Sequence, residues 1–178
     1  MILLLACSSP EPLPKLIEVP DFSLTSQANA PVSKATLTGK VWVADFIFTS
    51  CPGPCPILSA KMAEVQAHYA GEADLRLVSF TVDPATDTPP VLAPYAARFG
   101  AGPNWLFLTG DPKVVQTTIV DGFKQMLEQI PAVDGKPASI MHSERLVLVD
   151  RHGWMRAFPD PNAPGEVYAQ VDAVLKER

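Results

Sequence analysis

The sequence has few of the side chains on which most protein chemistry depends, with only three cysteines and three histidines among 178 residues. Basic residues are also scarce, since 14 lysines and arginines stand against 19 acidic residues and leave a net charge of −5. This charge gives no reason to expect nucleic acid or an anionic membrane surface as a partner. Because 47% of the residues are hydrophobic, the chain can still bury the core of one ordinary domain.

The first cysteine follows a short apolar run at the start of the sequence. Leu4-Leu5-Ala6-Cys7 is similar to the end of a bacterial lipoprotein signal, in which cleavage leaves a lipid-modified cysteine. The run is too short to span a bilayer and lacks the basic region of a signal peptide, so we expect part of the signal to be missing. We predict that residues 1–20 are a signal remnant and a flexible, proline-rich tether for a domain at 21–178. The alternative is an apolar N-terminus with a chance cysteine.

The other two cysteines share one short turn. A strand pattern over residues 41–49 is followed by Cys51-Pro52-Gly53-Pro54-Cys55, and a helical pattern then runs over residues 54–69. Proline suits the first turn of a helix because its missing N–H has no partner there. Unpaired N–H groups and the helix dipole predict that thiolates are favoured at this place. Such a pair can bind a soft metal, exchange electrons or clasp the turn.

The remaining elements predict an α/β fold. Strands are expected at residues 21–25, 31–40, 75–82, 104–109, 145–149 and 154–158, and helices at residues 88–99, 111–120 and 166–176. Residues 123–141 lack periodicity and are predicted to be a hairpin-like insertion before the late strand pair. The alternation of strands and helices favours a thioredoxin-like, three-layer fold with a central mixed sheet flanked by helices. Its ligand site is expected where the cysteine turn follows a central strand.

The three histidines have different prospects as ligands. His68 is predicted on the wet face of the first helix and His152 in a hairpin turn, so both are expected to be solvated. His142 precedes the strand expected beside the cysteine strand, where it can join Cys51 and Cys55. Two soft sulfurs and an imidazole favour Cu(I) and Cu(II), whereas structural zinc normally requires a fourth protein ligand, which is not evident.

Two other interpretations of the pair stay open. Thiol:disulfide oxidoreductases of the thioredoxin type have two residues between their cysteines and a proline before a late strand. Here three residues separate the cysteines, and a histidine takes the place of that proline. An oxidoreductase with Cys51 and Cys55 as its redox pair is therefore the alternative to metal binding, and enzymatic activity remains undecided. A permanent structural disulfide is the third interpretation.

Four motifs, in this order, resemble the Sco/SenC family. They are residues 46–56, residues 79–89, residues 105–110, and His142-Ser143 before residues 146–150. The resemblance implies a membrane-tethered, thioredoxin-like copper protein that assists assembly of the binuclear copper centre of cytochrome c oxidase. It implies copper ligands at Cys51, Cys55 and His142, and a partner that is the copper-binding oxidase subunit or another copper chaperone.

The same resemblance bears on location and on two further features. It implies the periplasmic face of the bacterial inner membrane, with a lipid anchor at Cys7. Asp83 and Asp87 fall in the family's DPxxDTP loop, for which we predict turn formation and helix capping. The family commonly has an acidic residue between the cysteines, where this chain has Gly53 between two prolines. We expect this departure to lower the thiol pKa values without removing a ligand.

Overall fold

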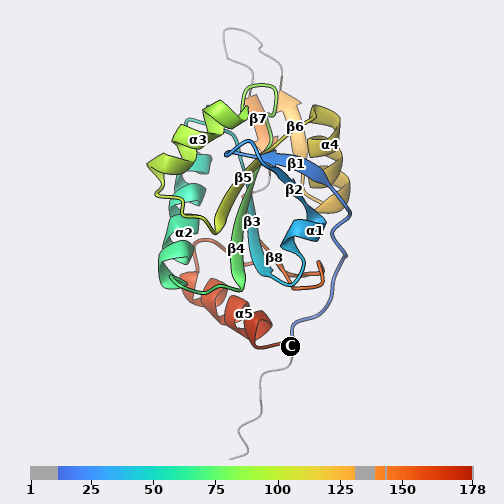
Figure 1. Cartoon of the computed structure of the whole chain (residues 1–178), viewed down its shortest axis with the longest axis vertical. Helices are drawn as coiled ribbons and strands as arrows, with labels where there is room; N and C mark the ends of the chain where they lie inside the picture. Colours follow the sequence, from blue (N-terminus) through green and yellow to red (C-terminus); the bar gives the residue numbers. More distant parts are fainter. Residues whose placement is uncertain (1–11, 131–138, 143, 178) are drawn as a thin grey trace, which may run out of the picture.

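A seven-stranded mixed sheet forms the centre of the computed structural model, which describes residues 12–130, 139–142 and 144–177 (Figure 1). The strand order is β2-β1-β5-β4-β3-β8-β9. The strands are β1 (Ser23–Ser26), β2 (Pro31–Ser33), β3 (Val41–Ile47), β4 (Leu75–Thr81), β5 (Trp105–Thr109), β8 (Val147–Val149) and β9 (Met155–Ala157). The helices are α1 (Lys34–Leu37), α2 (Pro54–His68), α3 (Pro89–Arg98), α4 (Pro112–Thr117), the π-helical turn η1 (Thr118–Gly122) and α5 (Pro164–Lys176).

Strand β3 lies inside the sheet and carries the cysteine turn at its carboxyl end. It pairs in parallel with β4 and antiparallel with β8, and all seven of its residues are buried. Helices α2 and α3 lie on one flank of the sheet and α4 lies on the other (Figure 1). This arrangement confirms the predicted thioredoxin-like α/β fold with a central mixed sheet.

Helix α2 follows the predicted pattern closely. It begins at Pro54 after Gly53 at the N-cap, and it ends at His68, shortly before Gly71, whose φ is +89°. Its buried side chains recur at helical spacing and face the core: Cys55, Leu58, Ser59, Met62 and Val65. Burial of this stripe fixes the rotation of the helix, and Cys55 is therefore directed inward from its first turn.

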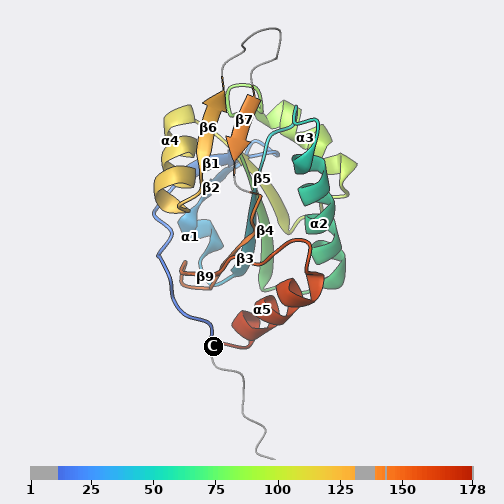
Figure 2. The same cartoon turned by 180° about the vertical axis from the view of Figure 1, so that it is seen from behind.

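The predicted insertion is a separate two-stranded hairpin formed by β6 (Leu127–Ile130) and β7 (Ser139–His142). It stands at the end of the molecule to which the N-terminus of α2 also points (Figure 2). His142 is the last residue of β7 and pairs in register with Leu127. It was predicted at the start of the strand beside β3, but that strand, β8, begins only at Val147. The hairpin rather than the main sheet therefore positions the imidazole.

Residues 13–19 were assigned to the tether, yet they pack along the edge of the domain. Leu16 N donates to Met155 O at 2.9 Å and Val19 N donates to Gly153 O at 2.8 Å. The Arg156 side chain, 3% exposed, donates to Leu13 O and forms an ion pair with Asp150. These residues are therefore part of the packed structure.

Membrane attachment was predicted through a lipid anchor at the start of the chain. Cys7, the predicted lipid anchor, lies outside the described residues. Within the described ranges no helix combines the length and the hydropathy needed to span a bilayer. The anchor therefore stays a prediction.

Candidate metal and dithiol site

The cysteine loop leaves β3 and turns tightly into α2. Cys51 N donates to Phe48 O at 3.2 Å, which closes the turn before the helix. The side chain of Cys51 is 7% exposed, whereas Cys55 is fully buried in the first turn of α2. Cys51 and Cys55 form no disulfide with each other in this structure.

The hairpin brings His142 to the cysteines across 87 residues of sequence. Its Nε2 lies 3.3 Å from Cys55 Sγ, and its ring meets Phe48 edge-on with centroids 5.8 Å apart. Cys51 and His142 line the same cavity of about 310 Å³. Two donors that share one ion of zinc's size stand about 3.5 Å apart, so the sulfur–nitrogen distance suits joint ligation.

The three proposed copper ligands are not yet arranged around a single point in this structure. Within the described ranges, no three side chains of His, Cys, Asp or Glu already stand as a metal-binding group. Cys55 and His142 are in contact, while Cys51 reaches the same cavity from the loop. The loop or the hairpin would therefore have to move for the three donors to close around one ion.

The protonation of Cys55 differs from the sequence-based expectation. Burial raises the pKa of Cys55 above its usual value; a backbone hydrogen bond from Phe48 opposes this, while Cys51 and the charge of Asp45 add to it. The helix N-terminus was expected to favour the thiolate, and for Cys55 the pKa moves in the opposite direction. The expectation for Gly53, which compares this chain with relatives that have an acidic residue there, stays a prediction. Removing the sulfur from water disfavours its anion, and this is the largest cause of the raised pKa.

A buried carboxylic acid, Asp45, lies on β3, the strand that leads into the cysteine loop. Burial raises the pKa of Asp45 to about 7, and the opposing effect of the neighbouring Ser79 hydroxyl is smaller. Neither carboxylate oxygen makes a hydrogen bond to the described residues, and Ser79 itself accepts from Trp105 Nε1 at 2.9 Å. Sequence analysis missed Asp45, although a lone acid inside an apolar strand pattern is a usable signal.

The DPxxDTP loop does more than cap a helix. Thr88 is the N-cap residue of α3, and Asp83 O accepts from Asp87 N at 2.8 Å, as the predicted turn and cap require. The Asp87 carboxylate, however, is fully buried and accepts from Thr49 N at 3.1 Å. It also accepts from the hydroxyls of Thr49 and Thr81. Asp87 therefore ties the end of β4 to the start of the cysteine loop.

Replacing Asp87 with asparagine is expected to lower the free energy of unfolding by about 2 kcal/mol, because charge-assisted hydrogen bonds to a buried carboxylate are lost. Hydrogen exchange at the Thr49 amide should accelerate at the same time. Urea denaturation and exchange measured by NMR check both effects. Asp83→Asn, in the same loop, is the matched control; equal losses in the two variants would contradict the anchoring role of Asp87.

The other two histidines lie away from this site. His68 is exposed and stacks on Tyr168 of α5, with centroids 3.8 Å apart. His152 is exposed in the turn between β8 and β9, where its backbone N donates to Asp150 Oδ1 at 2.9 Å. Their predicted surface positions are confirmed.

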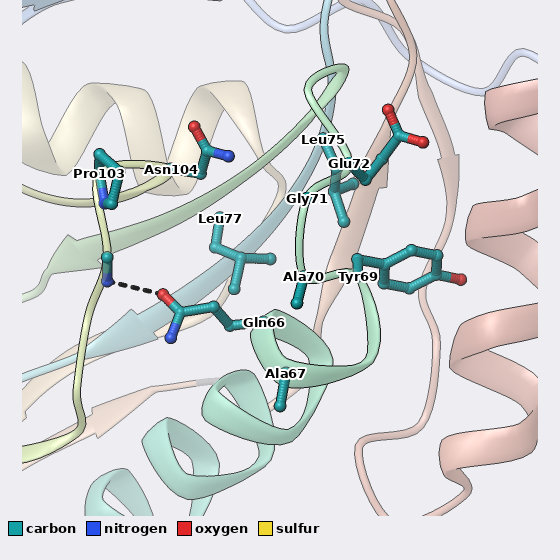
Figure 3. Close-up of a pocket in the computed structure, with 11 residues that line it drawn as sticks. Gln66, Ala67, Tyr69, Ala70, Gly71, Glu72, Leu75, Leu77, Pro103 and Asn104 are labelled. Carbon is teal, nitrogen blue, oxygen red and sulfur yellow. Dashed lines mark hydrogen bonds between the residues drawn. The ribbon is translucent and has the colours of Figure 1, made fainter.

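Another cavity, of about 320 Å³, lies at the opposite end of α2 (Figure 3). There Gln66 Oε1 accepts from Gly102 N at 2.7 Å, and the Tyr69 side chain points toward α5, where its hydroxyl donates to Asp172 at 2.9 Å. Neither cysteine nor histidine lines this cavity. The chemistry of the described residues therefore points to the cysteine loop and not to this hollow.

Fold and site together define a thioredoxin-like protein with a cysteine pair and a histidine in contact with one sulfur. The sequence model of the SCO1/SenC family matches residues 11–176. The chain is 34% identical over 139 residues to the SCO1 protein homolog of Bacillus subtilis. The aligned region covers 76% of this chain and 70% of the homolog. The chain therefore belongs to the SCO1/SenC family.

Solved structures agree with this assignment. A SCO1/SenC family lipoprotein from Bacillus anthracis is 28% identical, with a TM-score of 0.82 over 95% of this chain and 100% of the other. Copper-bound ScoI of Bradyrhizobium japonicum is 26% identical, with a TM-score of 0.78 over 89% and 99%. BsSco, described as having a disulfide switch and as a Sco family cytochrome c oxidase assembly protein, is 28% identical, with a TM-score of 0.77 over 94% and 100%.

Proposed function

We propose that this protein is a copper chaperone that binds one copper ion through Cys51, Cys55 and His142. The observation that carries the proposal is the 3.3 Å contact between Cys55 Sγ and His142 Nε2 at a cavity that Cys51 also lines. Two soft sulfurs and an imidazole suit Cu(I), and the imidazole also suits Cu(II). Membership of a family that includes a copper-bound relative supports the same cargo.

Loading would begin with Cys55 as a protonated thiol. Because burial raises the pKa of Cys55, its proton has to leave as the sulfur binds copper. The neighbouring imidazole at 3.3 Å can accept a hydrogen bond from that thiol and orient it. Unloading would proceed by ligand exchange, in which donors of the recipient replace the sulfurs and the imidazole one at a time.

The recipient in this proposal is the copper-binding subunit of cytochrome c oxidase or another copper chaperone. A Sco relative described as an oxidase assembly protein supports this choice. We also propose that the protein works on the periplasmic face of the inner membrane, anchored through lipid on Cys7, and a family lipoprotein supports this location.

Anaerobic titration of the reduced protein with Cu(I) and with Cu(II) tests the cargo directly. The expected result is saturation at about one copper per chain, with a sulfur-to-copper charge-transfer band for Cu(II). Failure of the reduced protein to bind Cu(I) more tightly than a Cys51→Ser/Cys55→Ser variant would exclude the proposal.

The second candidate is a thiol:disulfide oxidoreductase, favoured by the two cysteines of one short loop and by a relative described as having a disulfide switch. His142→Ala separates the two functions. A chaperone should lose copper affinity in this variant, whereas disulfide reduction by the two cysteines should survive largely intact. His68→Ala, which removes an exposed histidine on the same helix as Cys55, is the matched control for both assays.

A further inference from the structure

Two methionines near His142 differ from those of the core. Met62 and Met155 are fully buried, but Met126 is 63% exposed and Met141 is 49% exposed. An exposed thioether contributes little to the stability of a core, because most of its surface stays in water. Their position beside the proposed site therefore calls for another explanation.

Both exposed thioethers lie on the same cavity as the imidazole. Met126, Met141 and His142 line a cavity of about 440 Å³. Met141 and His142 also line the cavity of about 310 Å³ that contains Cys51. Met141 therefore borders both the cavity lined by Met126 and the cavity lined by Cys51.

The backbone holds Met126 at this cavity. The preceding Lys124 has a φ of +55°, a left-handed conformation that non-glycine residues adopt at a cost. Gln125 is buried, and its backbone N donates to Ile119 O at 3.1 Å while its side-chain amide donates to Phe123 O at 2.8 Å. This anchored turn presents the next side chain, that of Met126, outward.

We propose that Met126 and Met141 form a thioether site that receives Cu(I) and passes it to Cys51 and Cys55. The inference rests on the proposed copper function and adds an entry route to it. Thioethers are soft ligands that select Cu(I), and they need no deprotonation before binding. They can therefore hold the ion at the cavity that they share with His142.

The charges around the cavity suit a brief stay of the ion. Lys124 and Arg145 line the same cavity, and their positive charges lower its affinity for a cation. Transfer forms bonds from copper to the two cysteine sulfurs and to the imidazole while the two bonds to thioethers break. The thiol protons leave to solvent, and copper remains Cu(I) throughout.

The direct test uses the full chain with Cys51→Ser/Cys55→Ser substitutions and 13C-methyl labelled methionine. Ag(I), a soft and redox-inert probe, is titrated while the methyl resonances are followed by NMR. We expect the resonances of Met126 and Met141 to shift together and saturably, while those of the buried Met62 and Met155 stay in place. Absence of a saturable shift at Met126 and Met141, or equal shifts at all four, would overturn the proposal.

A kinetic test uses Met126→Leu/Met141→Leu in the protein with both cysteines. Leucine keeps the apolar volume but removes the sulfur, so a surface that serves only apolar docking would be little affected. We expect Cu(I) uptake from a chelator complex, followed by stopped-flow, to slow by about tenfold, whereas Val91→Leu, exposed on α3, should not slow it. If the variant takes up Cu(I) at a rate within about twofold of the unsubstituted protein, the thioether entry route is rejected, but the site of Cys51, Cys55 and His142 is not. If the unsubstituted protein does not bind Cu(I), the proposed copper function is rejected instead.

Discussion

The Cu(I) affinity of the reduced protein is expected to rise by at least about tenfold for each pH unit between about pH 6 and 8. Burial raises the pKa of Cys55, so the thiol keeps its proton over this range and copper must displace it. Each proton released on binding contributes a factor of ten per pH unit, or about 1.4 kcal/mol. Competition with a chelator of known Cu(I) affinity, corrected for the chelator's own protonation, measures the slope.

Cys55→Ser provides the control for this slope. Loss of a direct sulfur ligand should lower the affinity by more than about a hundredfold, which is the upper end of the losses typical of outer-shell partners. The remaining pH dependence should be smaller by about one proton. A parent affinity that does not change with pH would show that Cys55 is already ionised, and the burial argument would then fail.

Local patterns were sufficient for the elements that hold the cysteines. The apolar run of β3, the prolines at the start of α2 and the helical spacing of its buried side chains are all short-range signals, and each was confirmed. The hairpin of β6 and β7 could be predicted only as an insertion, and its approach to the cysteine loop depends on contacts across many residues. The expected place of His142 beside the strand next to the cysteine strand indicated that it belongs with the cysteines, and the motif match implied the same ligand set.

The errors arose where burial competes with a local effect. A helix N-terminus favours a thiolate, but the sequence does not show that Cys55 is fully buried, and burial raises the pKa of its thiol. The role of Asp87 was missed for a related reason: its turn is local, but its hydrogen bonds to Thr49 and Thr81 join the cysteine loop to the end of β4. Charges inside the fold are therefore the part of the site that sequence analysis predicts least well.

Asp45→Asn is expected to make the stability of the protein less dependent on pH. Burial raises the pKa of Asp45 to about 7, from about 3.9 in an unfolded chain. Asp45 therefore destabilises the fold only at pH values at which its carboxyl is ionised in the unfolded chain. This penalty is absent below about pH 4, grows from there to about pH 7, and is constant above. The loss of unfolding free energy from pH 4.5 to pH 8 should shrink by about 3 kcal/mol in the variant.

Comparing the two pH values within each protein separates ionisation from packing. A buried amide brings N–H groups that lack partners, but this cost is the same at both pH values and cancels in the difference. Urea denaturation at pH 4.5 and pH 8 gives the two free energies, and Glu64→Gln removes an exposed carboxyl as the matched reference. The charge of Asp45 also raises the pKa of Cys55, so alkylation of Cys55 by iodoacetamide at pH 8 should be faster in Asp45→Asn. An unchanged stability difference would mean that folding leaves the pKa of Asp45 at its ordinary value, and the burial argument would then fail. An unchanged alkylation rate would mean that the carboxyl of Asp45 exerts no field on Cys55.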